Sequence, residues 1–148
     1  MKRVLGVLLA LPVLGAVVSA HIMVSPPQSK AGATQAYELR VHNEGTVATT
    51  ALDLEIPASI TVLAIDQPAV GTVVSHKDGD RIVGFTWTVD VPPSKYQALK
   101  FSAKNPGSEQ SVAWIVHQHL ADGTIVEWSD KPDAKEHAAV TTISASTN

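Results

Sequence analysis

Short runs in which apolar and polar residues alternate one by one recur along this chain, and they limit its fold more than any other feature. One run places Tyr37, Leu39 and Val41 on one side and Glu38 and Arg40 on the other. A period of two is that of a β-strand with one buried and one solvent-facing side. Further runs of this kind cover residues 52–56, 83–89 and 99–103. No helical period extends beyond a turn or two, so we expect an all-β chain.

Turn residues separate these runs at short intervals. Asp-Gly pairs at residues 78–79 and 122–123 stand between apolar segments, and Asp-Gly is a strong hairpin signal. We therefore predict a single antiparallel β-sandwich of about seven to nine strands, the architecture in which half-buried strands cover one another. One run, residues 112–116, is apolar throughout, which predicts a central strand buried on both faces.

The first twenty residues are typical of a cleaved export signal. Lys2 and Arg3 form a basic start, residues 4–18 are almost wholly apolar, and small residues lead up to Ala20. The apolar run is shorter than the roughly 20 residues of a membrane-spanning helix, which disfavours the alternative of an uncleaved anchor. We expect a signal peptide over residues 1–20, a domain over 21–143 and a flexible tail over 144–148, with no membrane anchor in the mature chain.

Composition excludes several classes of function. The 148 residues include no cysteine, so a disulfide framework, a thiolate metal site and a cysteine nucleophile are excluded. Acidic residues number 14 against 11 Lys and Arg, and no basic run is present, which argues against nucleic acid as a partner. Neither a nucleophile motif nor a glycine-rich phosphate loop appears. Any metal ligands must therefore be nitrogen, oxygen or methionine sulfur.

Cleavage after Ala20 would make His21 the first residue of the mature chain. A terminal histidine can hold one metal ion through its freed α-amine and its imidazole Nδ1, whereas an internal histidine offers a ring nitrogen alone. Amine, imidazole and carboxylate donors suit Cu(II), which favours tetragonal nitrogen and oxygen coordination. The sequence therefore predicts a metal site at His21. The competing interpretation is a terminal residue that binds nothing.

Four segments of the mature chain stand in an order and spacing that are specific together, although none is diagnostic alone. They are His-Ile-Met-Val-Ser-Pro-Pro from His21, the stretch from Tyr37 to Glu44, Ala-Lys-Asn-Pro at 103–106, and the segment from Trp114 to Trp128. Together they resemble the YcnI-like family of exported copper-binding proteins. The resemblance covers nearly the whole mature chain and implies a cupredoxin-like β-sandwich that binds one Cu(II) per chain in a monohistidine brace.

In such a brace the terminal histidine supplies its amine and ring nitrogen, a carboxylate supplies oxygen, and a tryptophan lies close to the metal. Carried over by position, these residues are His21, Glu44 and Trp128. Glu44 has the competing interpretation of a solvated turn residue, with Glu38 as the alternative ligand, and Trp128 that of a core residue. The implied role is a periplasmic protein, not an enzyme, that sequesters copper or passes it to a transporter or another carrier.

One departure from the family bears on this site. The family usually shows proline where this chain has His42, which lies two residues from Glu44 and so on the same strand face. Whether His42 touches the metal is open at this point. His117 and His119 also alternate on one strand face and could pair at a metal, although a polar continuation of the strand is the simpler interpretation.

Two other classes of function remain. A small copper-dependent oxidative enzyme would need a second histidine in its brace and an exposed surface for a polymer. The chain has only two Phe, two Tyr and three Trp, which leaves little material for such a surface. The other class is a protein-interaction sandwich that binds no metal and whose terminal histidine is accidental.

Overall fold

A computed structural model describes residues 20–147. The predicted signal peptide, apart from Ala20, and the last residue of the predicted tail lie outside these described residues. Within them the chain forms thirteen β-strands, none of the residues belongs to a helix that could cross a membrane, and the predicted all-β sandwich is confirmed. The strands are β1 His21–Ser25, β2 Gln28–Lys30, β3 Thr34–His42, β4 Thr49–Glu55, β5 Thr61–Ile65, β6 Thr72–Asp78, β7 Arg81–Val91, β8 Tyr96–Lys104, β9 Gln110–Trp114, β10 Val116–Leu120, β11 Ile125–Ser129, β12 Glu136–His137 and β13 Ala139–Ser144.

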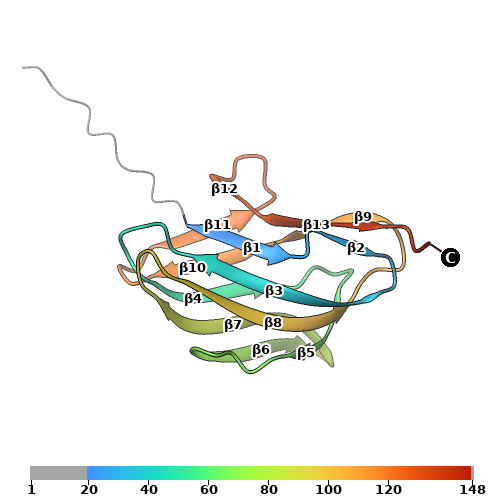
Figure 1. Cartoon of the computed structure of the whole chain (residues 1–148), viewed down its shortest axis with the longest axis horizontal. Helices are drawn as coiled ribbons and strands as arrows, with labels where there is room; N and C mark the ends of the chain where they lie inside the picture. Colours follow the sequence, from blue (N-terminus) through green and yellow to red (C-terminus); the bar gives the residue numbers. More distant parts are fainter. Residues whose placement is uncertain (1–19, 148) are drawn as a thin grey trace, which may run out of the picture.

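The strands form three sheets arranged in layers (Figure 1). One sheet has the order β1-β3-β8-β5, a larger one the order β12-β11-β10-β4-β7-β6, and a small one the order β2-β13-β9. Pairing is antiparallel except between β11 and β12 and between β13 and β2. The strand count exceeds the expected seven to nine partly because β2 and β12 have only three and two residues, too few to show alternation in the sequence. The last strand includes Ser144, the first residue of the predicted tail.

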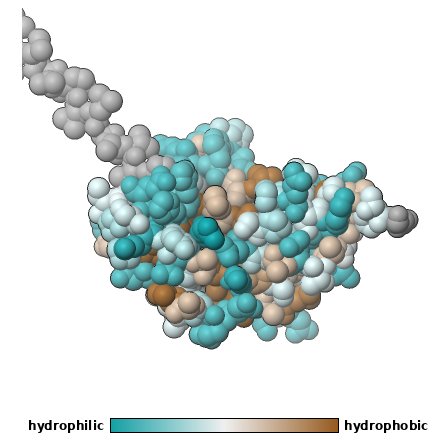
Figure 2. Space-filling view, in the orientation of Figure 1, coloured by the Kyte–Doolittle hydropathy of each residue, from teal (hydrophilic) through white to brown (hydrophobic). Residues whose placement is uncertain are grey.

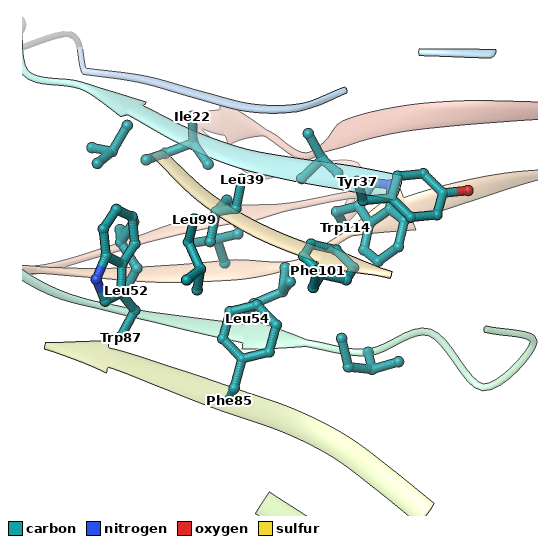
Figure 3. Packing of buried hydrophobic residues seen from close by; sticks show 14 of the residues in the cluster. Ile22, Tyr37, Leu39, Leu52, Leu54, Phe85, Trp87, Leu99, Phe101 and Trp114 are labelled. Atoms are coloured by element: carbon teal, nitrogen blue, oxygen red, sulfur yellow. The ribbon is translucent and has the colours of Figure 1, made fainter. Parts of the chain in front are cut away.

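The inward faces of the two large sheets share one core (Figure 3). Leu39 and Phe101 come from one sheet and Leu52 and Phe85 from the other, and all four are at most 1% exposed. The rings of Phe85 and Phe101 meet edge to face with centroids 5.6 Å apart, a favoured aromatic geometry. The alternation predicted for these strands is therefore confirmed, with the apolar side of each strand facing the opposite layer.

The apolar run over residues 112–116 is not one central strand, and that prediction is wrong. The chain leaves the small sheet after β9 and enters the six-stranded sheet with β10, with Ile115 between them. Val112, Trp114 and Val116 are buried, whereas Ala113 and Ile115 are only half-buried. Val112, Trp114 and Val116 contribute to the core while the chain passes from one sheet to another, so the run does not form a single strand that is covered on both faces.

Both predicted hairpins are present. Gly79 turns between β6 and β7 with a φ of 59°, and Gly123 turns between β10 and β11 with a φ of 87°. These left-handed backbone conformations favour glycine. Beside the second turn, the Thr124 amide donates a hydrogen bond of 2.9 Å to Asp122 Oδ1, and this bond lowers the pKa of Asp122. The second hairpin also brings β11, and with it Trp128, alongside β10.

Candidate metal site

The antiparallel pairing of β1 with β3 places His21 directly opposite His42. His21 is the first residue of β1 and His42 the last of β3, so both residues lie at the same end of this strand pair. Directly opposite residues of an antiparallel pair project on the same face, with Cβ atoms about 4.5–5.5 Å apart. Both side chains are accessible to solvent, at 61% and 45%.

Glu44 brings its carboxylate to both rings. Its Oε1 lies 3.1 Å from His21 Nδ1 and 3.4 Å from His42 Nδ1. These three side chains are the only group of three His, Asp or Glu residues, within the described part of the chain, whose candidate donor atoms all lie within 4.8 Å of one another. Of the two carboxylates weighed from the sequence, Glu44 is therefore the one that meets His21.

Asn43 holds the turn that carries Glu44. Its side chain is 1% exposed, and its Nδ2 donates to the carbonyls of Val47 and Val91 at 2.9 and 2.8 Å. Its Oδ1 accepts the amide of Gly45 at 2.9 Å, which is the hydrogen bond of an Asx-turn. Sequence reasoning did not single out Asn43 as a positioning residue, although the Asn-x-Gly spacing is a turn signal that could have pointed to it.

The donor set fits a first-row divalent ion. Ligand atoms around a four-coordinate ion with metal–ligand distances of about 2 Å lie about 3–4 Å apart, and the distances of 3.1 and 3.4 Å from Glu44 Oε1 to the two histidine Nδ1 atoms fall in this range. Two imidazoles and one carboxylate suit borderline ions such as Cu(II) and Zn(II), and the absence of cysteine excludes a thiolate site. In the uncleaved chain the His21 nitrogen is a peptide amide, so the α-amine donor exists only after Ala20 is removed.

Trp128 is not one of the three converging residues, and its indole is 6% exposed. Its Nε1–H donates to Gln118 Oε1 at 3.1 Å, and Gln118 Nε2 donates to Thr49 Oγ1 at 2.8 Å. Trp128 nevertheless lines a hollow of about 210 Å³ together with Ala20 and Asn43. These are the residues that immediately precede His21 and Glu44 in the sequence.

The other candidates from the sequence lie elsewhere. Glu38 is paired with Ser25, at the opposite end of β1 from His21, and it accepts a hydrogen bond from Arg40 at 2.8 Å. His117 and His119 do project from one face of β10, but each contacts a separate carboxylate.

Those two contacts join β10 to β4. His117 Nε2 lies 2.9 Å from Glu55 Oε1, and His119 Nε2 lies 2.7 Å from Asp53 Oδ2. The structure therefore does not bring the two rings together around a third ligand. It does not support the interpretation of His117 and His119 as a metal-binding pair.

A second, shallow hollow of about 210 Å³ borders the site on its outer side. It is lined by His21 and His42 together with Met23, Arg40 and Tyr96. Arg40 lies over the Tyr96 ring, with Cζ 5.3 Å from the ring centroid, and its charge is balanced by Glu38. No sequence pattern indicated that Tyr96 lies beside the site, because its position depends on the pairing of β3 with β8.

The chain is similar to known proteins over most of its length. A family model described as a domain of unknown function (DUF1775) matches residues 21–142. The copper-binding protein CutI of Bacillus subtilis (strain 168) is 31% identical over 130 residues, which are 86% of this chain and 64% of that protein. The chain thus spans a little less than two thirds of the length of that relative.

Solved structures with the same fold are also known. An uncharacterized protein from Nocardia farcinica, described as having an immunoglobulin-like fold, superposes with a TM-score of 0.71 at 25% identity, over 84% of this chain and 98% of that one. A non-cellulosomal cohesin from Archaeoglobus fulgidus has a TM-score of 0.52 at 13% identity, over 86% and 91% of the two chains, and shows the fold alone. From the extent of the family match and the identity to CutI, the chain belongs to the DUF1775 family, and its resemblance to the YcnI-like proteins is confirmed.

Proposed function

We propose that this protein is an exported Cu(II)-binding protein that holds one ion at its mature N-terminus. The observation that carries the proposal is the 3.1 Å separation between His21 Nδ1 and Glu44 Oε1. His21 is the residue that signal cleavage would expose. The relative CutI is named a copper-binding protein, and copper is the ion that the donor set favours on chemical grounds.

Two boundaries support His21 as the first residue of the mature chain. The predicted cleavage point lies just before it, and the region matched by the family model begins at it. The freed α-amine and the Nδ1 of His21 would then bind the ion as a chelate, with the Glu44 carboxylate as an oxygen donor. Such a chelate is available only to a terminal histidine.

Removal of Ala20 would also change the surroundings of Trp128. Ala20 is 6% exposed and shares a hollow with the indole, so cleavage would replace a buried methyl group with a charged or metal-bound amine. We propose that Trp128 then borders the metal and limits the access of water and external ligands. A shielded ion suits sequestration or hand-over to a transporter or another carrier, and export by a signal peptide suits a periplasmic location.

A copper-dependent oxidative enzyme is the second candidate, because His42 stands where a second histidine could join the brace. The surroundings favour binding over turnover. Tyr96 is the one aromatic residue in the hollow beside the site, and on the face shown in Figure 2 apolar residues occur in small separate areas between polar ones. Oxidant-dependent cleavage of a polysaccharide by the copper-loaded mature protein would favour the enzyme.

Calorimetry with Cu(II) tests the proposal on two forms of the chain. One begins at His21, and the other retains Ala20 in front of it with the new terminal amine acetylated, which converts the His21 amine donor into an amide without adding another amine. We expect one tight Cu(II) per chain for the first form and an affinity at least about 100-fold lower for the second, since loss of a ligand exceeds the effect of losing its supporting contacts.

Three variants of the mature form extend the test. His21→Ala should lose tight binding, and Glu44→Gln should weaken it, while the control variant His117→Ala on the six-stranded sheet should bind as the unaltered protein does. Equal affinity of the chains with and without Ala20 would show that the amine is not a ligand and would contradict the proposed site.

A further inference from the structure

His42 belongs to the candidate metal site, and its polar contact with Glu44 is long. Its Nδ1 lies 3.4 Å from Glu44 Oε1, longer than the contacts made by other histidine rings of the protein. His76, His117 and His119 each have a polar partner at 2.7–2.9 Å. The Glu44 oxygen nearest to His42 is also the one that His21 approaches more closely, so a single oxygen faces two imidazole nitrogens.

Backbone pairing on both sides fixes the backbone position of His42. His42 is opposite His21 on β1 and opposite Tyr96 on β8. The next residue, Asn43, donates its backbone amide to Lys95 and accepts a hydrogen bond from the Ser94 amide. A residue held by neighbours on both strands and by a buried residue after it loses little further freedom when it binds a ligand, which favours affinity.

Two imidazole nitrogens and one carboxylate oxygen therefore converge on one point at the edge of the sheet. Lone pairs that converge in this way repel one another unless a proton or a cation lies between them. The 45% exposure of the His42 side chain leaves the point open to an ion from solvent. This convergence is the arrangement that a metal ion stabilises, and His42 is one of its three members.

We propose that His42 is a direct ligand, so that the site in this protein has four protein donors. This inference rests on the proposed function, because it takes the ion to be Cu(II) and the His21 amine to be free. The donors are then the amine and ring nitrogen of His21, the ring nitrogen of His42 and the Glu44 carboxylate. Four such donors match the four strong positions of tetragonal Cu(II), and they leave none of these positions to water.

The alternative is that His42 only orients Glu44 through a hydrogen bond. The two roles differ in the number of nitrogens that couple to the unpaired electron of Cu(II). The experiment is electron paramagnetic resonance of the mature protein loaded with one equivalent of Cu(II), with the hyperfine coupling of each nitrogen resolved. We expect three coupled nitrogens in the unaltered site, and two in both His42→Gln and His42→Ala.

His42→Gln is the decisive variant because its amide can still hydrogen-bond Glu44 but is a poor ligand for Cu(II). We expect its Cu(II) affinity to fall at least about tenfold, and azide to shift the visible spectrum of the loaded variant but not that of the unaltered protein, since water now occupies a strong position. His117→Gln is the matched control and should change neither property. Circular dichroism of the apo proteins establishes that each variant is folded.

The outcomes separate this inference from the proposed function. Unchanged nitrogen count and affinity in His42→Gln would overturn His42 as a ligand while leaving the site of His21 and Glu44 intact. Three coupled nitrogens in the unaltered protein and two in His42→Gln would support it. If the mature protein takes up no Cu(II), or if retention of Ala20 leaves binding unchanged, the proposed function fails and the inference fails with it.

Discussion

The buried amide of Asn43 donates to the carbonyl of Val91 at 2.8 Å and so ties the turn carrying Glu44 to β7 of the opposite sheet. The same amide also donates to Val47, within its own loop. The candidate ligand is thus positioned by a hydrogen-bonded residue next to it in sequence, although Glu44 itself is in part exposed.

Replacement of Asn43 should therefore affect both stability and metal binding. Asn43→Ala leaves the two carbonyls without their donor, and an unsatisfied buried polar group costs about 1–3 kcal/mol. We expect the free energy of unfolding to fall by this amount in urea denaturation. Cu(II) affinity should fall about 10- to 100-fold, as it does when a contact that orients a ligand is lost.

Asn105 provides the matched control for that change. It is likewise a buried amide, 4% exposed, but it bonds Ser29 and Lys30 rather than the metal-site turn. Asn105→Ala should lower the free energy of unfolding to a similar degree and leave Cu(II) affinity unchanged. A parallel loss of affinity in Asn105→Ala would mean that general destabilisation, not the orientation of Glu44, weakens binding.

Trp128 should report copper binding by fluorescence. Cu(II) quenches indole emission at short range, and Trp128 shares a hollow with the residue that precedes His21. We expect Trp128→Phe to remove most of the Cu(II)-dependent quenching seen in the mature protein, whereas Trp87→Phe should retain it. If quenching persists in Trp128→Phe and disappears in Trp87→Phe, the indole of Trp128 does not border the metal.

The pKa of Asp53 predicts a contribution to stability that depends on pH. Burial acts to raise the pKa of Asp53. Hydrogen bonds from Thr86 and His119 and the charges of His119 and His117 outweigh burial, so the pKa lies below its ordinary value. A carboxyl whose pKa is lower in the folded than in the unfolded state stabilises the fold above the unfolded value, and this contribution disappears as the pH falls through the folded value.

Thr86→Val tests that contribution, because Thr86 Oγ1 donates to Asp53 Oδ1 at 2.6 Å. At neutral pH we expect a loss of about 0.5–1.5 kcal/mol in the free energy of unfolding, toward the lower end because Asp53 is partly exposed. The difference in the free energy of unfolding between Thr86→Val and the unaltered protein should shrink as the pH falls below the ordinary pKa of a carboxyl group. Urea titrations repeated at progressively lower pH measure this difference. A difference that stays constant or grows on acidification would contradict this assignment.

Cu(II) binding should depend on pH through proton release. An imidazole and an α-amine bind a metal only in their deprotonated forms, and the free groups have pKa values of about 6.5 and about 7.7–8.0. We expect Cu(II) affinity to fall steeply below about pH 6. Calorimetry in buffers of different ionisation enthalpy measures the protons released, and a constant affinity between about pH 5 and 8 would be inconsistent with an amine ligand.

The local elements follow from the sequence because their causes are local. The alternation around Leu39 and around Phe85 determines which side of each strand is buried, and the structure has both residues in the core. The Asp-Gly pairs mark the two hairpins. The prediction for residues 112–116 was wrong because a local pattern does not show which sheet a strand joins. The run is apolar both for a strand covered on two faces and for a chain that changes sheets at Ile115.

Some residues of the candidate site could be predicted from the sequence, and others could not. The order of residues and the cleavage pattern are enough to single out His21, and the resemblance to a family pointed to Glu44 and Trp128. The residue chemistry alone left Glu38 as an alternative to Glu44 and left the role of His42 open. The structure brings Glu44 and His42 to His21 and places Glu38 at the far end of β1.

The sequence by itself therefore determined that the chain is an all-β sandwich whose predicted N-terminal histidine can chelate a metal, because a two-residue period and a cleavage pattern are properties of consecutive residues. Only the tertiary structure decided which groups surround that histidine. That choice depends on the register of β1 against β3, which sets His21 opposite His42, and on a hydrogen bond between Asn43 and a residue 48 positions away. Strand register and long-range contacts arise from the packing of the whole chain, and no short segment encodes them.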